Sequence, residues 1–360
     1  MNKLPDEDIK INVGITSGDI NGIGYEVIMK SLADQRMCEL FTPIVYGTSK
    51  ASSYHRKTIN ISDFNFNIIR KADQASAKKP NIVNLRDDEV KIDLGIATTE
   101  SGEMAYQSLE AAVEDLKRNL INVLVTAPIN KHAIRQAGFE FPGHTEYLAS
   151  KFETEDYLMI MVSGKMRIGM VTGHLPIRQV AEALSKELIL KKIRTLHDSL
   201  IRDFNIGKPK IAVLGLNPHA GENGMIGEEE VNMITPVVQE LFNDGMLVYG
   251  PFPADGFFGS FKFREFDGIL AMYHDQGMLP FKTLSFESGV NFTAGLPIVR
   301  TSPAHGTAYE IAGKDMASPD SFREALYLAC DIFRNRVLYE ELTSNPLVNH
   351  RDDRNDAAES

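Results

Sequence analysis

The stretch KIAVLGLNPH, residues 210–219, is an apolar run that passes into a polar turn ending in a histidine. MRIGMVTGH at 166–174 and FDGILAMYH at 266–274 repeat the same pattern. Short apolar runs that alternate with amphipathic helical stretches are typical of buried strands in a parallel sheet covered by helices. The sequence therefore predicts a layered α/β architecture with a largely parallel sheet.

The three histidines that end these stretches are His174, His219 and His274. Ligands of open α/β sheets bind beyond the carboxyl ends of the strands, so these side chains can meet although 45 and 55 residues separate them. Three neutral imidazoles with an open fourth position form a catalytic site for a divalent metal. We predict that they bind one ion, with zinc the best match and magnesium, cobalt or manganese as alternatives. The alternative for each histidine is an ordinary loop residue with satisfied hydrogen bonds.

Further elements follow from the same patterns along the chain. Strands are expected at 9–15, 42–47, 122–128, 157–163 and 297–302, and helices at 100–118, 185–204, 227–243 and 318–339. A break after TAPINK (126–131) suggests a central metal- and substrate-binding α/β domain at 130–300. Residues 1–129 together with 301–360 are expected to form a second, discontinuous α/β domain.

Composition and charge exclude several classes of protein. The 360 residues carry 49 acidic and 38 basic side chains, a net charge of −11, which argues against nucleic acid or an anionic membrane as a partner. No apolar stretch of about 18 residues occurs, so no membrane span is expected. The two cysteines, Cys38 and Cys330, offer neither a disulfide framework nor a redox motif. A cytoplasmic protein is expected.

Two carboxylates accompany the histidines. Asp255 lies in the turn GPFPADGFF, and Asp275 directly follows His274. Each could take part in catalysis by binding the metal or by accepting a hydrogen bond from a ligating imidazole. The competing interpretation is that each aspartate caps the start of a helix.

Several other residues are candidates for binding an anionic small molecule. Lys282, Asn291 and Arg300 lie in an otherwise apolar, glycine-spaced stretch, and arginine and lysine suit a phosphate or carboxylate. His144 and Thr145 are expected at the N-terminus of a helix, where free backbone N–H groups attract anions, although Thr145 could be only a cap. His305 and Gly306 enter another helix and are candidates for cofactor binding. The glycine-bearing loop TSGDINGIG (16–24) matches no nucleotide-binding motif.

Taken together, these motifs resemble the 4-hydroxythreonine-4-phosphate dehydrogenase (PdxA) family. The strings that carry the resemblance are TAPINK, FPGHTEYLA, TGHLPIRQV, LGLNPHAGENG, GPFPAD, AMYHDQGMLPFK and GVNFTAGLPIVRTSPAHGTAYEIAGK. The resemblance implies two α/β/α domains with a cleft between them, as in isocitrate and isopropylmalate dehydrogenases, and a homodimer whose active site is shared between subunits. It assigns His174, His219 and His274 to the metal, and His144, Thr145, Lys282, Asn291 and Arg300 to the substrate.

The resemblance also implies a reaction. NAD would oxidise the secondary alcohol of 4-phosphooxy-L-threonine, and the resulting 3-keto acid would lose CO2 to give 3-amino-2-oxopropyl phosphate in vitamin B6 biosynthesis. Lys282 could be the proton donor or a phosphate ligand. Related dehydrogenases that act on 4-phospho-threonate or 4-phospho-erythronate are the main alternative. A metal-dependent phosphoester hydrolase and a non-catalytic phosphate-binding module are two further ones.

Overall fold

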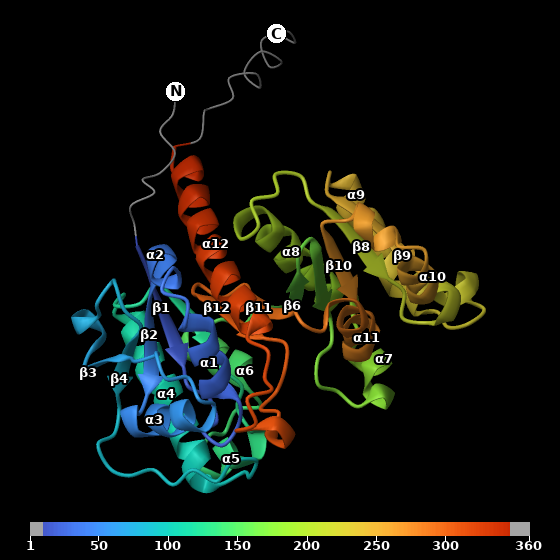
Figure 1. The fold of residues 1–360 in the computed structure, drawn as a ribbon. Coiled ribbons are helices and arrows are strands. Elements are labelled where there is room, and N and C mark those ends of the chain that lie inside the picture. Colours follow the sequence, from blue (N-terminus) through green and yellow to red (C-terminus); the bar gives the residue numbers. More distant parts are fainter. Residues whose placement is uncertain (1–9, 346–360) are drawn as a thin grey trace.

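One continuous twelve-stranded sheet runs through both lobes of the protein (Figure 1). The computed structural model describes residues 10–345. The strand order is β3-β4-β2-β1-β5-β12-β11-β6-β7-β10-β8-β9. The strands are β1 (Ile11–Thr16), β2 (Phe41–Gly47), β3 (Asn67–Ile69), β4 (Asn81–Asn84), β5 (Val123–Thr126), β6 (Leu158–Ser163), β7 (Met166–Met170), β8 (Lys210–Leu214), β9 (Leu247–Phe252), β10 (Gly268–Ala271), β11 (Val290–Ala294) and β12 (Val299–Pro303).

The sheet is parallel within each lobe and changes direction at its centre. Strands β3, β4, β2, β1, β5 and β12 all run parallel to their neighbours, and so do β7, β10, β8 and β9. Between these halves, β11 is antiparallel to both β12 and β6, and β6 is antiparallel to β7. The predicted α/β architecture with a largely parallel sheet is confirmed.

Helices cover the sheet, as the alternating pattern requires. The longer ones are α1 (Gly24–Leu32), α3 (Ser49–Thr58), α4 (Thr99–Lys117), α6 (His144–Lys151), α8 (Lys186–Arg202), α9 (Thr235–Asn243), α11 (His274–Ser285) and α12 (Asp320–Thr343). Shorter ones include α2 (Met37–Leu40), α5 (Lys131–Gln136), α7 (Val180–Ala183) and α10 (Ala254–Gly259). Within the described residues, no helix is long and apolar enough to span a membrane.

The central strands have two different faces because side chains alternate along a strand. On one face, Phe292 and Val299 pack in the core with Leu326 of α12, and the Thr301 hydroxyl donates to the Ala325 carbonyl at 2.7 Å. The opposite face of β11 and β12 carries Asn291, Arg300 and their neighbours. No helix of the described part of the chain seals that face completely, since a cavity opens on it.

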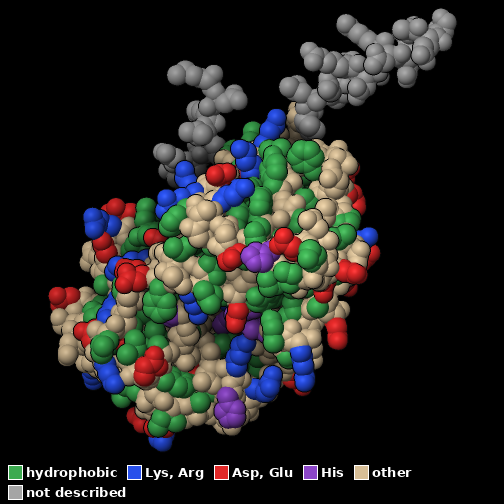
Figure 2. Space-filling model, turned by 90° about the vertical axis from the view of Figure 1, so that its right-hand side faces the viewer, with side chains coloured by type: hydrophobic (Ala, Val, Ile, Leu, Met, Phe, Trp, Pro, Cys, Tyr) green, Lys and Arg blue, Asp and Glu red, His purple; other side chains and the backbone are tan. Residues whose placement is uncertain are grey.

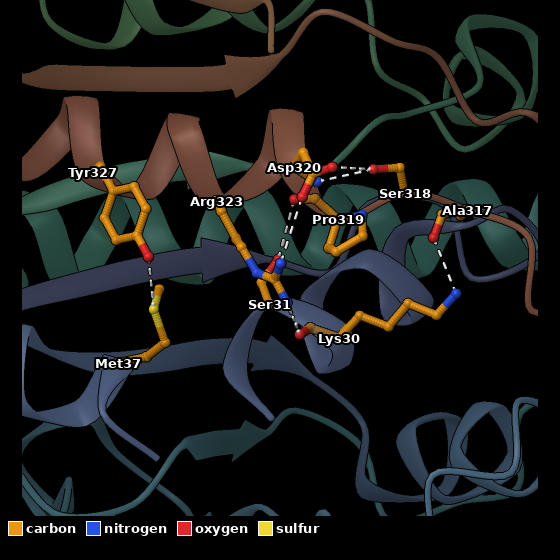
Figure 3. A network of polar contacts seen from close by, with 9 residues as sticks. All are labelled: Lys30, Ser31, Met37, Ala317, Ser318, Pro319, Asp320, Arg323 and Tyr327. Atoms are coloured by element: carbon orange, nitrogen blue, oxygen red, sulfur yellow. Dashed lines mark hydrogen bonds and ion pairs between the residues drawn. The ribbon is translucent and has the colours of Figure 1, made fainter. Parts of the chain in front are cut away.

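Hydrogen bonds join helix α12 and the loop before it to helix α1 near the N-terminus (Figure 3). The Arg323 guanidinium donates to the Lys30 carbonyl at 2.8 Å, and Lys30 Nζ donates to the Ala317 carbonyl at 3.0 Å. These contacts join residues more than 280 positions apart, from two segments that the sequence assigns to one discontinuous domain. The proposed boundary at 300/301 falls inside β12, and the division into domains stays a prediction.

Candidate active site

A cavity of about 890 Å³ lies on the uncovered face of the central strands. Its wall combines the end of β5, the start of α6, the turn after β7, part of α11 and strands β11 and β12. This volume is within the range of pockets that enclose a small molecule. In the space-filling view, histidine side chains lie in a hollow with basic side chains close by (Figure 2).

Arg300 is the most deeply buried charged group of this wall, with only 3% of its surface exposed. Its Nε and Nη2 both donate to the Thr126 hydroxyl, at 3.1 and 2.7 Å, and Nη1 lies 3.4 Å from the Thr293 hydroxyl. Burial lowers the pKa of Arg300 to about 10, so the group remains charged at neutral pH. Among the described residues no carboxylate accepts a hydrogen bond from it, although the charge of Glu146 is close enough to stabilise it. A buried cation in this state favours an anionic ligand.

His144 extends the same polar surface. Its Nδ1 lies 3.2 Å from Nη2 of Arg300, which can only donate, so Nδ1 is the acceptor and the proton of a neutral ring sits on Nε2. Burial, with the charges of Arg300 and Lys131, holds the pKa of His144 well below its usual value. His144 Nε2 and Asn291 Oδ1 are buried without a partner in the described structure. A donor and an acceptor are therefore available to a ligand in the cavity.

The helix that carries His144 begins as the sequence predicts. Helix α6 starts at His144, and its N-cap is Gly143, which makes no side-chain capping bond. Thr145 is therefore not the cap; its hydroxyl lies 3.5 Å from that of Thr293. The first backbone N–H groups of α6 are left without a capping side chain at the edge of the cavity, a position that favours a bound anion.

Two of the three predicted metal ligands come together. The ring centroids of His174 and His274 are 5.6 Å apart, close to the spacing of about 5 Å expected for two imidazoles on one zinc ion with Zn–N bonds of about 2.0 Å. Burial, Lys131 and His274 lower the pKa of His174, which favours the neutral ring that binds metal. Nδ1 of His274 is 2.7 Å from Oδ1 of Asp275, so its Nε2 is directed elsewhere.

The third histidine stands apart from this pair. His219 is exposed, does not line the cavity, and lies in a turn at Pro218–Gly224 that follows β8. Strand β10 separates β8 from β7, so two strand spacings lie between the ends that carry His219 and His174. Within residues 10–345, no three His, Cys, Asp or Glu side chains are grouped to hold one ion.

The remaining predicted residues divide between the cavity and the surface. Lys282 of α11, Asn291, His305 and Gly306 line the cavity. Burial lowers the pKa of His305, and its Nε2 has no partner in the described structure. Asp255 lies exposed in the first turn of α10, outside the cavity wall, where an acidic residue suits the helix terminus.

The cavity also contains residues that the sequence does not single out. Lys131 begins α5 and contributes positive charge next to both His144 and His174. Thr126 ends β5 and holds Arg300. Both belong to the TAPINK segment, whose position directly after an apolar strand is the available signal.

The geometry defines a class: a two-lobed α/β protein whose candidate site, basic and histidine-rich, lies on the central strands. Comparison with known proteins identifies the family. Residues 39–329 match the model of the family described as pyridoxal phosphate biosynthetic protein PdxA. The chain belongs to the PdxA family of dehydrogenases.

Individual relatives cover nearly the whole chain. It is 52% identical over 342 residues to 4-hydroxythreonine-4-phosphate dehydrogenase of Bacteroides thetaiotaomicron. This alignment covers 95% of this chain and 94% of that protein. It is 34% identical over 325 residues to D-threonate 4-phosphate dehydrogenase of Pectobacterium atrosepticum, in an alignment that covers 89% of this chain and 98% of that protein. The crystal structure of the Klebsiella pneumoniae 4-hydroxythreonine-4-phosphate dehydrogenase superposes with a TM-score of 0.79 at 34% identity. The superposition covers 91% of this chain and 100% of that one.

Proposed function

We propose that this protein oxidises and decarboxylates 4-phosphooxy-L-threonine with NAD, giving 3-amino-2-oxopropyl phosphate, CO2 and NADH. The observation that carries the proposal is the buried Arg300 guanidinium beside a neutral His144 whose Nε2 is free, in a cavity of about 890 Å³. This arrangement suits a small anion. The 52% identity to a relative named 4-hydroxythreonine-4-phosphate dehydrogenase supports the choice of substrate.

The chain's own residues would bind and orient the substrate. Arg300, the Nε2–H of His144 and the N-terminus of α6 would hold an anionic group, and Asn291 Oδ1 would accept a hydrogen bond from a hydroxyl or ammonium group. Lys282, an exposed residue of α11 that lines the cavity, would be placed to ligate the phosphate or to protonate the carbon that loses CO2. His305 and Gly306 would contact the cofactor.

We assign a divalent metal, best zinc, to His174 and His274 of one subunit and to His219 of a second subunit. The pair fits such an ion because its spacing matches and the low pKa of His174 keeps that ring neutral. When bound, NAD would supply the hydride acceptor, and the metal would supply a Lewis acid that stabilises negative charge on an oxygen of the substrate. Asp275 would fix the orientation of His274 through their 2.7 Å contact.

The test is a substrate panel. NADH formation would be followed at 340 nm with 4-phosphooxy-L-threonine, 4-phospho-threonate and 4-phospho-erythronate, with and without added zinc, magnesium, cobalt or manganese. We expect the highest kcat/KM with 4-phosphooxy-L-threonine and loss of activity on chelation. Turnover confined to the threonate would instead favour the function named for the Pectobacterium relative. Phosphate release without NAD would indicate a hydrolase.

A homodimer with a shared active site is part of this proposal. Each segment that carries a metal-ligand histidine also exposes large apolar side chains. Leu175 and Ile177 follow His174, Met225 (84% exposed) and Ile226 follow His219, and Leu279 (69%), Leu284 and Phe286 (74%) follow His274. Exposed apolar clusters of this kind mark association surfaces, and a second copy on this face would bring its His219 toward the pair.

Phe286→Asp combined with Leu279→Asp is therefore expected to give a monomer with almost no activity, because two buried charges would oppose association. Light scattering measures the mass. The matched control is Leu342→Asp near the C-terminal end of α12, where the leucine is equally exposed (68%) but belongs to none of the three segments that carry the histidines, so the dimer should persist. A monomeric parent protein, or an active dimer of the double variant, would contradict the proposal.

A further inference from the structure

We propose that Glu230 is a positioning residue for His219: it holds the left-handed turn that presents this imidazole to the metal. The inference rests on the proposed role of His219 as a metal ligand. The turn follows β8, and Glu230 lies a few residues beyond it, at the start of the short helical segment Glu230–Ile234.

The turn has an uncommon backbone. His219, Ala220, Gly221, Glu222 and Asn223 all have positive φ, between 43° and 76°. Left-handed conformation is disfavoured for residues with a Cβ and normally occurs at single positions. Five left-handed residues in succession, four of them with a Cβ, persist only where surrounding contacts determine the backbone, and strain of this kind is concentrated at functional sites.

Glu230 binds the segment that leads directly into this turn. Only 2% of this residue is exposed. Its Oε1 accepts from the backbone N–H groups of Leu216 and Asn217, both at 2.7 Å, and its Oε2 accepts from Nδ2 of Asn217 at 3.0 Å. No ion pair of Glu230 occurs in the described part of the chain. Almost all hydrogen bonds to this buried carboxylate come from one loop segment. The cost of burying its charge is therefore offset only while that segment keeps its conformation.

The turn also packs directly on this carboxylate. A Cβ at Gly221 would lie 2.5 Å from Oε2 of Glu230, and one at Gly215 would lie 3.1 Å from Oε1. The carboxylate therefore touches the strand exit at Gly215 and the middle of the left-handed turn at Gly221. His219 lies between these two contacts, so its direction depends on Glu230.

Glu230→Gln is a sharp test because glutamine has the same shape but only one acceptor oxygen. In one orientation the amide oxygen accepts from the two backbone N–H groups, and the glutamine NH2 then points at the NH2 of Asn217, which is also a donor. In the other orientation the NH2 opposes both backbone donors. Either way the segment loses hydrogen bonds, and the turn should loosen without a change in side-chain volume.

The experiment measures metal binding to the full-length protein. Co²⁺ would be titrated into the parent, Glu230→Gln, His219→Ala and the control Glu228→Gln, and its binding would be followed by calorimetry and by visible absorption. The side chain of Glu228 is exposed, and among the described residues it hydrogen-bonds only to Asn232. We expect Glu230→Gln to weaken Co²⁺ binding roughly 10- to 100-fold and to change its spectrum, with activity restored at saturating metal. Glu228→Gln should match the parent.

The outcomes separate the two proposals. Parent-like Co²⁺ affinity in folded Glu230→Gln, with weak binding in His219→Ala, would overturn the role of Glu230 alone. Parent-like affinity in His219→Ala would overturn the metal assignment itself. If Glu230→Gln does not fold, Asn217→Ala keeps the carboxylate and its backbone bonds, and a loss of Co²⁺ affinity of several-fold is then expected. Unchanged affinity there would also contradict the inference.

Discussion

Alanine in place of His274 or His174 is expected to lower kcat by roughly 10³-fold or more, because stabilisation of charge by a bound metal is worth several kcal/mol. The centroids of the two rings lie 5.6 Å apart, and removal of either ring should leave too few ligands for tight binding. Metal content by elemental analysis and NADH formation would both be measured. His219→Ala should behave alike if the second subunit contributes this ligand.

The control for this result is His132→Ala. His132 is exposed on α5 and does not line the cavity, so both metal content and activity should stay at the parent level. Full metal occupancy in all three variants of the predicted ligands would refute the assignment. Loss of metal with retained activity would show that the metal has no part in the reaction.

Arg300→Ala is expected to reduce kcat/KM on the phosphorylated substrate by roughly 10²-fold or more, since a charged hydrogen-bonded pair is worth about 2–5 kcal/mol. The guanidinium is buried, and no carboxylate of residues 10–345 accepts a hydrogen bond from it, so a substrate anion would supply the missing acceptor. Binding at a remote phosphate also positions the reacting alcohol, so kcat should fall as well as KM rise. An unphosphorylated analogue should be affected much less.

Arg300→Lys supplies the matched control for charge. Lysine keeps the positive charge but cannot make both contacts to Thr126, so an intermediate loss is expected. Thermal unfolding of each variant would show whether the buried site still folds. Equal losses on phosphorylated and unphosphorylated substrates would mean that Arg300 binds a carboxylate or supports the fold, not the phosphate.

The sequence predicts strands well where they are apolar and uninterrupted. The runs at 42–47, 157–163 and 210–216 correspond to β2, β6 and β8. It misses β3 and β4, which span only three and four residues at the sheet edge, β9, which contains Pro251, and β11 (VNFTA), a five-residue strand with two polar side chains. Helix α11 is not predicted because it contains Gly277 and Pro280, and glycine and proline both have a low intrinsic helix propensity. Tertiary packing overrides local preference there.

The site is predictable residue by residue but not in its assembly. His144, Lys282, Asn291, Arg300 and His305 all line one cavity, as their chemistry suggests. The spacing of His219 relative to a strand end says nothing about the direction of the following turn, which depends on the distant contact with Glu230. The position of Lys131 at the end of TAPINK places it near a strand end, but only the fold shows that its charge acts on His174.

Strand β12 lies between β5 and β11 at the middle of the sheet, yet it comes last in sequence among the strands of residues 10–345. Until residue 303 has left the ribosome, β5 and β11 both present unpaired edges, and the apolar face that α12 covers is open. Unpaired strand edges promote aggregation of nascent chains. The order of translation therefore leaves the growing polypeptide with two exposed strand edges at the middle of its sheet until β12 has emerged and paired with both of them.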